Sequence, residues 1–167
     1  MQVELDVAQN DLPKFLQWSS KGMLDALAMG YEVFGFGSIL DQVAQRLNLD
    51  VASLHKVTNP ELLLEDFIEG IKPNDHDELT RWLQRFREFD HRRKSAWQSP
   101  AELRTCIIEL TMALDDHPSI FEEVGVDPDP YGNYFLSGVF RKELDQLLQI
   151  VVWAEENNVL RLRLIWS

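Results

Sequence analysis

Both ends of this 167-residue chain alternate apolar side chains with polar or charged ones. Near the N-terminus the intervening residues are polar or acidic: Met1, Val3, Leu5 and Val7 alternate with Gln2, Glu4 and Asp6. Near the C-terminus they are basic: Leu160, Leu162, Leu164 and Trp166 alternate with Arg161 and Arg163. A period of two is typical of half-buried β-strands, so we predict one strand at each end.

The opposite charges of the two segments predict that these strands pair in one sheet. An antiparallel register sets Glu4 opposite Arg163 and Asp6 opposite Arg161. A parallel register exchanges the partners and satisfies the same charges, so the direction stays open. Opposite charges directly across a strand pair contribute about 0.2–1 kcal/mol each. Termini joined in one sheet, in a chain of this length, indicate a single globular domain over residues 1–167.

Between the two ends, capping residues, prolines and glycines that flank apolar stripes predict about six helices. We expect them over about residues 12–30, 39–49, 60–70, 75–89, 100–114 and 140–156. Residues 31–38 favour a short strand or a buried turn, and residues 126–135 favour a loop because they contain two prolines. The predicted fold class is therefore α+β, mostly α-helical, with a small sheet that includes the N- and C-terminal strands.

Several features set the expected environment of the chain. No apolar run approaches the roughly 18 residues of a membrane span, and the first residues do not resemble a secretory signal. We therefore expect a cytoplasmic protein without a membrane partner. Cys106 falls in the apolar stripe of the helix expected over residues 100–114, so we predict a buried, unreactive thiol.

The acidic residues are concentrated in two segments, although the net charge of −12 belongs to the whole chain. Residues 105–140 hold seven carboxylates and no Lys or Arg, and residues 57–80 hold seven carboxylates against one Lys. Like charges within a Debye length of about 8–10 Å repel one another, so such clustering costs stability unless a basic partner compensates it. The alternative interpretation is an ordinary solvated surface that keeps the protein soluble.

On the first interpretation, acidic side chains attract a basic protein and nearby aromatic rings anchor it. The predicted partner-binding residues are Asp115, Asp116, Glu122, Glu123, Asp127, Asp129, Tyr131, Tyr134 and Phe135. Carboxylates of the segment from Glu61 to Asp77 would assist them. We expect no nucleic-acid partner, because a chain of this charge repels nucleic acid.

A metal-dependent hydrolase is the main alternative. His55, His76, Asp77 and a later Asp115 or Asp116 superficially resemble the order of ligands in the helical HD phosphohydrolases. That resemblance implies a divalent metal that activates water. A simpler interpretation is that His76 and Asp77 occupy a first helical turn, where acidic side chains favour the helix dipole.

Other chemical motifs are incomplete. The loop from Asp127 begins like a calcium-binding EF-hand loop, but Gly138 stands where the bidentate Glu belongs. The basic and aromatic stretch from Arg81 to Trp97 could contact nucleic acid, but its spacing favours core aromatics with arginines facing solvent. We predict no cofactor, no metal and no enzymatic activity.

The preferred hypothesis is a small acidic module that neutralises a basic protein. In size, charge and lack of a catalytic motif the chain resembles bacterial toxin inhibitors known as immunity proteins. That resemblance implies that it blocks a nuclease-like cleft. A third hypothesis is an adaptor subunit of a larger assembly, which would use Tyr31, Phe34 and Phe36 as its contact.

Overall fold

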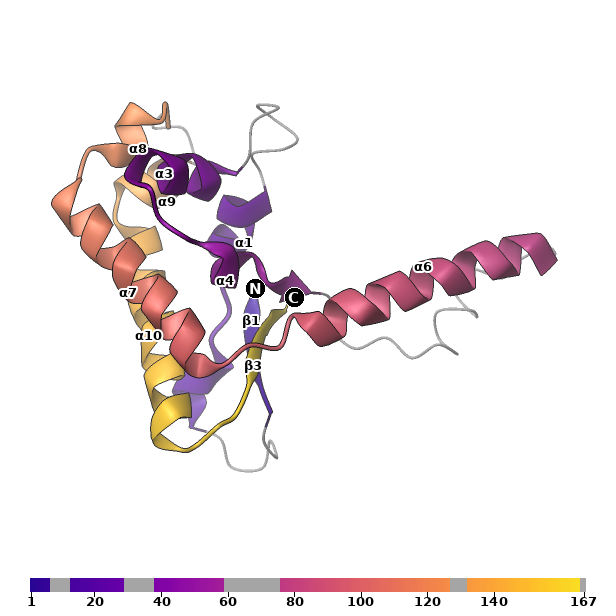
Figure 1. Cartoon of the computed structure of the whole chain (residues 1–167). Coiled ribbons are helices and arrows are strands. Elements are labelled where there is room, and N and C mark those ends of the chain that lie inside the picture. Colours follow the sequence, from indigo (N-terminus) through magenta and orange to yellow (C-terminus); the bar gives the residue numbers. More distant parts are fainter. Residues whose placement is uncertain (7–12, 29–37, 59–75, 127–131, 166–167) are drawn as a thin grey trace.

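A computed structural model describes residues 1–6, 13–28, 38–58, 76–126 and 132–165 (Figure 1). These residues form a mostly helical fold with a small three-stranded sheet, which confirms the predicted fold class. In chain order the elements are β1 (Gln2–Leu5), the 3-10 helix η1 (Lys14–Gln17), α1 (Lys21–Ala28), α3 (Ile39–Leu47), α4 (Ala52–His55), β2 (Val57–Thr58), α6 (His76–Ser95), α7 (Pro100–Asp116), α8 (Ile120–Glu123), α9 (Gly132–Leu136), α10 (Val139–Glu156) and β3 (Leu162–Ile165).

The N- and C-terminal strands pair as their charges predict. The sheet has the order β1-β3-β2, and β1 runs antiparallel to β3 with Glu4 opposite Arg163. Of the two registers that the sequence allows, the antiparallel one is therefore correct. Beyond the last paired residues, the guanidinium of Arg161 donates to the carboxylate of Asp6 over 2.8 Å. The sequence did not predict β2, which is only two residues long and runs parallel to β3.

Arg163 lies in the middle strand and its side chain is only 2% exposed. Two of its guanidinium nitrogens, Nε and Nη2, donate to one carboxylate oxygen of Glu4 over 2.9 and 2.7 Å. Its guanidinium carbon lies 4.5 Å from the ring centroid of Trp97, and that of Arg161 lies 5.6 Å from the same ring. The charge of Arg163 is thus removed from water but is paired and stacked.

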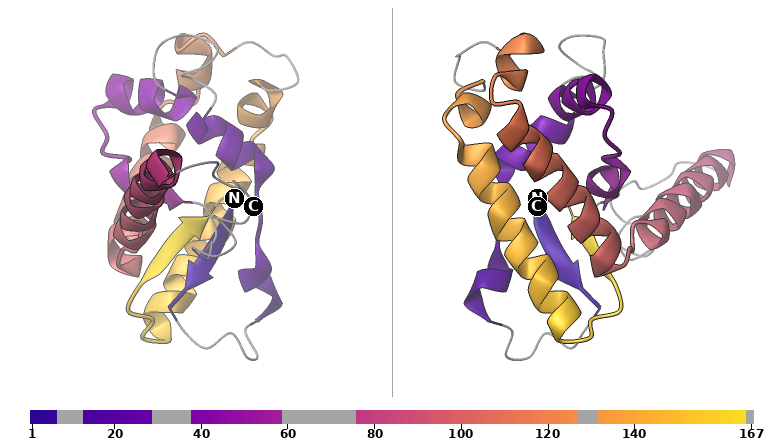
Figure 2. Two further views of the ribbon diagram at one scale, coloured as in Figure 1. Left: turned by 90° about the vertical axis from the view of Figure 1, so that its right-hand side faces the viewer. Right: turned by 60° about the vertical axis from the view of Figure 1, so that its left-hand side comes forward.

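The two long helices α7 and α10 run side by side and antiparallel beside the sheet (Figure 2). Ion pairs link them at both ends, between Arg141 and Asp115 over 3.2 Å and between Arg104 and Glu155 over 3.3 Å. Their facing sides supply a large part of the core: Leu103, Ile107, Leu110, Leu114, Leu144, Leu147, Ile150 and Val151. Helix α6 extends away from this body (Figure 1).

Predicted helix starts agree with the observed caps at two helices. Ser38 and Asp41 form a reciprocal capping box at the start of α3, and Ser99 caps α7 with Pro100 in its first turn. Such caps satisfy backbone N–H groups that have no partner within the helix. The helix expected from residue 75 extends to Ser95 rather than to residue 89.

The prediction of a single helix over residues 12–30 is wrong for the part of this range that the structure describes. It is divided into η1 and α1, because Trp18 is extended and the next residues follow the N-terminal strand. Ser19 forms a bridge with Gln2, and the backbone N–H of Ser20 donates to the carbonyl of Met1 over 2.8 Å. Strand pairing therefore replaces helical hydrogen bonds at this point.

Candidate functional site

Four of the predicted partner-binding carboxylates lie at one end of the molecule. Asp115 and Asp116 occupy the last turn of α7, and Glu122 and Glu123 belong to the short helix α8 that follows it (Figure 1). Ile120 and Phe121 fix α8 to the core, so its two glutamates face solvent. We refer to Asp115, Asp116, Glu122 and Glu123 as the acidic end.

Arginines neutralise half of the acidic end. Asp115 accepts from Arg141, which also pairs with Asp145 one turn further along α10. The hydrogen bond from Arg141 to Asp115 is the largest effect on the Arg141 guanidinium, and it raises the pKa of Arg141. Glu123 pairs with Arg46 of α3 over 3.4 Å.

The other half of the acidic end has no cationic partner among the side chains that the structure describes. Within the described ranges, neither Asp116 nor Glu122 forms an ion pair with any side chain, and both residues are exposed. The two free carboxylates are separated by one short turn between α7 and α8. They therefore leave a local excess of negative charge at the acidic end.

Of the predicted aromatic anchors, Phe135 lies in the core and Tyr134 packs against the core with its ring partly buried. Phe135 is 6% exposed, and its ring centroid lies 4.9 Å from that of Phe121 and 5.3 Å from that of Phe140. Tyr134 is half-buried and packs edge-on against Phe135 and Phe140. These ring contacts attach α8 and α9 to α10. The expected loop over residues 126–135 is partly wrong, because α9 begins at Gly132.

Three predicted binding residues, Asp127, Asp129 and Tyr131, lie outside the described residues. The same holds for most of the acidic segment from Glu61 to Asp77 and for the adaptor contact of Tyr31, Phe34 and Phe36. Their roles stay predictions.

A polar network connects three helices and has no sequence signal. The carboxylate of Glu143 on α10 accepts hydrogen bonds from the hydroxyls of Ser20 and Tyr134. The Ser20 hydroxyl in turn accepts from the backbone N–H of Met23 over 2.9 Å. Because Ser20 and Glu143 lie 123 residues apart in the chain, residue patterns could not have revealed the contact between them.

The residues of the hydrolase hypothesis have other partners. His55 Nε2 lies 2.7 Å from a carboxylate oxygen of Asp41, the same aspartate that completes the α3 capping box. His76 and Asp77 begin α6, where the first-turn interpretation places them. Among the side chains that the structure describes, no three His, Cys, Asp or Glu residues gather closely enough to hold a metal ion.

Cys106 faces the core from α7, as predicted. Burial raises the pKa of its thiol to about 11, with a smaller effect from the Asp50 carboxylate in the same direction. The thiolate, which is the reactive form, is therefore disfavoured near neutral pH.

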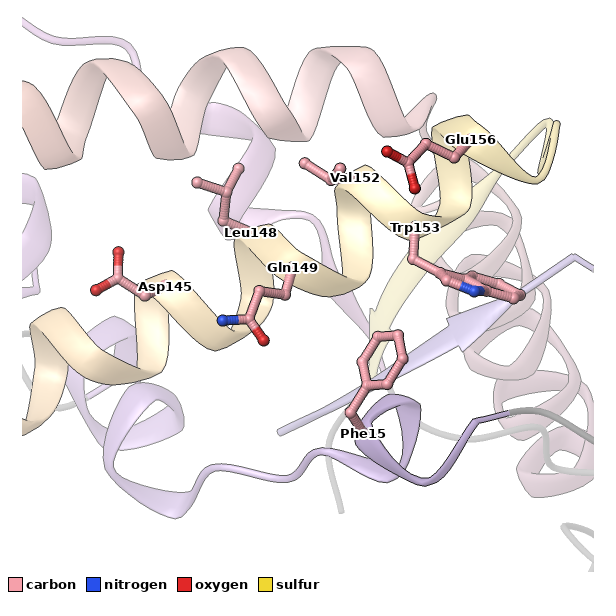
Figure 3. Close-up of a pocket in the computed structure, with 7 residues that line it drawn as sticks. All are labelled: Phe15, Asp145, Leu148, Gln149, Val152, Trp153 and Glu156. Carbon is pink, nitrogen blue, oxygen red and sulfur yellow. The ribbon is translucent and has the colours of Figure 1, made fainter.

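A surface groove between η1 and α10 was not predicted. It has a volume of about 630 Å³ and is lined by Phe15, Asp145, Leu148, Gln149, Val152, Trp153 and Glu156 (Figure 3). The sequence feature that could have indicated this groove is the width of the apolar stripe on α10. Leu148 and Val152 extend the stripe beyond the buried residues, so a single neighbouring helix does not cover them fully.

No described helix is both long enough and apolar enough to cross a membrane. Comparison with protein-family models, with curated proteins and with solved structures found no match for this chain.

Proposed function

We propose that the protein is a binding module that neutralises a basic protein partner. The observation that carries this proposal is the acidic end, where four carboxylates lie on the last turn of α7 and on α8, and two of them, Asp116 and Glu122, have no ion-pair partner among the described side chains. Lysines and arginines of a partner would supply the missing countercharge.

Physical reasoning favours such a surface for fast recognition. Two guanidinium groups offset two of the four carboxylates, so the acidic end keeps a negative potential that reaches into solvent. Complementary potentials mainly raise the association rate and the specificity of a complex. Apolar contacts must then slow dissociation, and Tyr134 and Phe135 do not offer exposed rings for this purpose.

In its most specific form, the proposal is a bacterial immunity protein that blocks a nuclease-like cleft. A nuclease cleft is built to bind phosphates, so grouped carboxylates would occupy the same cationic positions. The carboxylates Asp127 and Asp129, which follow α8 closely in the sequence, stay predicted binding residues of the same surface.

A charge-reversal experiment tests the proposal. The partner is first captured from cells of the source organism at low salt and purified. Its association with the parent chain and with the double variant Asp116→Lys/Glu122→Lys is then measured by stopped-flow fluorescence. We expect the association rate to fall by about tenfold or more and to depend less steeply on salt.

The matched control is Glu88→Lys/Glu102→Lys, which makes the same change of charge on exposed residues of α6 and of the first turn of α7. It should lower the association rate much less, because α6 extends away from the acidic end and the first turn of α7 lies at the opposite end of that helix (Figure 1). Equal rates for the parent and the acidic-end variant, with both folded, would contradict the proposal. Inhibition of the captured partner's nuclease activity tests the more specific form.

A further inference from the structure

The solvent-facing side of α10 carries a second surface with a different character from the acidic end. Phe15 and Trp153 lie near each other, and Gln149 points to the same side of α10 as the two rings (Figure 3). Leu148 and Val152 lie on the side of α10 toward α7 and are partly buried (Figure 3). Phe15 is 46% exposed, which is unusual for a large aromatic ring that has an apolar neighbour available.

The charged residues of the groove all have one sign. Asp145 and Glu156 line it, and no Lys or Arg does so among the described residues. Asp145 pairs with Arg141, whereas Glu156 has no ion-pair partner in the described part of the chain. The uncompensated charge therefore lies at the Glu156 end of the groove.

The spacing of these residues defines what the groove can hold. Asp145 and Glu156 are eleven residues apart on one helix, which corresponds to about 16 Å along its axis. The apolar side chains Leu148, Val152 and Trp153 lie between them. A helix laid along α10 presents residues eleven positions apart on nearly the same face, with its own apolar residues between them.

From this complementarity we propose that the groove docks a basic amphipathic helix of a partner protein. The apolar face of that helix covers Phe15, Leu148, Val152 and Trp153. A Lys or Arg near one end pairs with Glu156, and a second approaches Asp145. Helix-in-groove recognition combines such apolar anchors with a charged rim. This inference goes beyond the proposed function, because it concerns another surface and does not require the acidic end.

A synthetic peptide tests the groove directly. The probe is a fluorescein-labelled helical peptide of about 15 residues, with two lysines eleven positions apart and leucines between them on the same face. Its counterpart carries glutamate at both lysine positions. Fluorescence anisotropy with the full chain should show that the lysine peptide binds about tenfold more tightly than the glutamate peptide.

Two variants with matched controls locate the binding. Phe15→Ala should weaken binding of the lysine peptide by about tenfold, as expected for an aromatic anchor. Leu160→Ala, at a position that is 79% exposed elsewhere on the surface, should not change it. Glu156→Lys should remove the preference for lysine over glutamate, whereas Glu88→Lys on α6 should keep it.

Several outcomes would overturn this inference. Equal affinity for the two peptides, or no effect of Phe15→Ala in a folded variant, would show that the groove does not recognise a basic helix. A concentration-dependent dimer that Phe15→Ala abolishes in sedimentation experiments would assign the groove to a second copy of this chain. If Asp116→Lys/Glu122→Lys weakens binding of the lysine peptide as much as Glu156→Lys does, the net charge of the protein rather than the groove is responsible for the binding. None of these results decides the role of the acidic end, which the partner association rate tests.

Discussion

At the scale of single residues, the buried guanidinium of Arg163 is the group whose loss we expect to destabilise the protein most. Its partner, Glu4, is 27% exposed and would stay behind as a poorly solvated, unpaired carboxylate. We therefore expect Arg163→Met to lower the free energy of unfolding by about 3 kcal/mol, measured by urea denaturation. Replacing both partners in Glu4→Gln/Arg163→Met should recover part of this loss, since the unpaired charge is then absent.

Arg161→Met is the control at the same scale. Arg161 makes a similar ion pair with Asp6 just beyond the paired ends of β1 and β3, but its side chain is 57% exposed. Exposed pairs contribute less than about 1 kcal/mol, so this variant should unfold at nearly the parent urea concentration. Equal losses for the two arginine variants would mean that burial does not set the contribution of Arg163.

At the scale of elements, the contact between α1 and α9 reverses the usual effect of a helical glycine. A Cβ atom added at Gly22 would lie 2.7 Å from Cδ2 of the Tyr134 ring, which is held by Phe135, Phe140 and its hydrogen bond to Glu143. Gly→Ala within a helix normally stabilises by roughly 0.5–1 kcal/mol. Here we expect Gly22→Ala to destabilise by about 1–3 kcal/mol, as overpacking does, and thermal or urea unfolding measures it.

A double-variant cycle isolates the cause of that effect. In a Tyr134→Ala background the ring is absent, so Gly22→Ala should become neutral or stabilising. A loss of the same size with and without the ring would indicate strain in the α1 backbone instead of a contact with α9.

The same elements show how much of the fold the sequence could predict. Local signals predicted the terminal strands, the capped starts of α3 and α7, and the buried position of Cys106, because each depends on neighbouring residues. The division between η1 and α1 could not be predicted in this way. It depends on pairing between Ser19 and Gln2, a contact between separate segments that no local pattern encodes.

The sequence predicted less of the candidate sites than of the fold, because the sites also depend on contacts between separate segments. Clustered carboxylates indicated the acidic end, but its arginine partners, Arg46 and Arg141, come from other helices. Tyr134 and Phe135 looked like surface anchors beside a proline-containing loop, whereas α9 places Phe135 in the core and packs Tyr134 against it. The groove depends on Phe15 of η1 meeting α10, which is again a tertiary contact.

At the scale of the whole molecule, salt should affect folding and binding in opposite directions. The net charge of −12 makes the compact state repel itself, while most of the ion pairs are partly exposed and contribute little. Raising NaCl from about 10 to about 150 mM shortens the Debye length from about 30 to about 8 Å. We therefore expect the melting temperature to rise over this range while association with a basic partner becomes slower.

The acidic-end variant checks the origin of both effects. Asp116→Lys/Glu122→Lys removes two negative charges and adds two positive ones, so its melting temperature should depend less on salt than that of the parent. Differential scanning calorimetry at the two salt concentrations measures this response. If the parent instead becomes less stable as salt is added, its own ion pairs outweigh the repulsion. The unpaired carboxylates would then exert no net repulsion for a partner to relieve, and the proposed function would lose its physical basis.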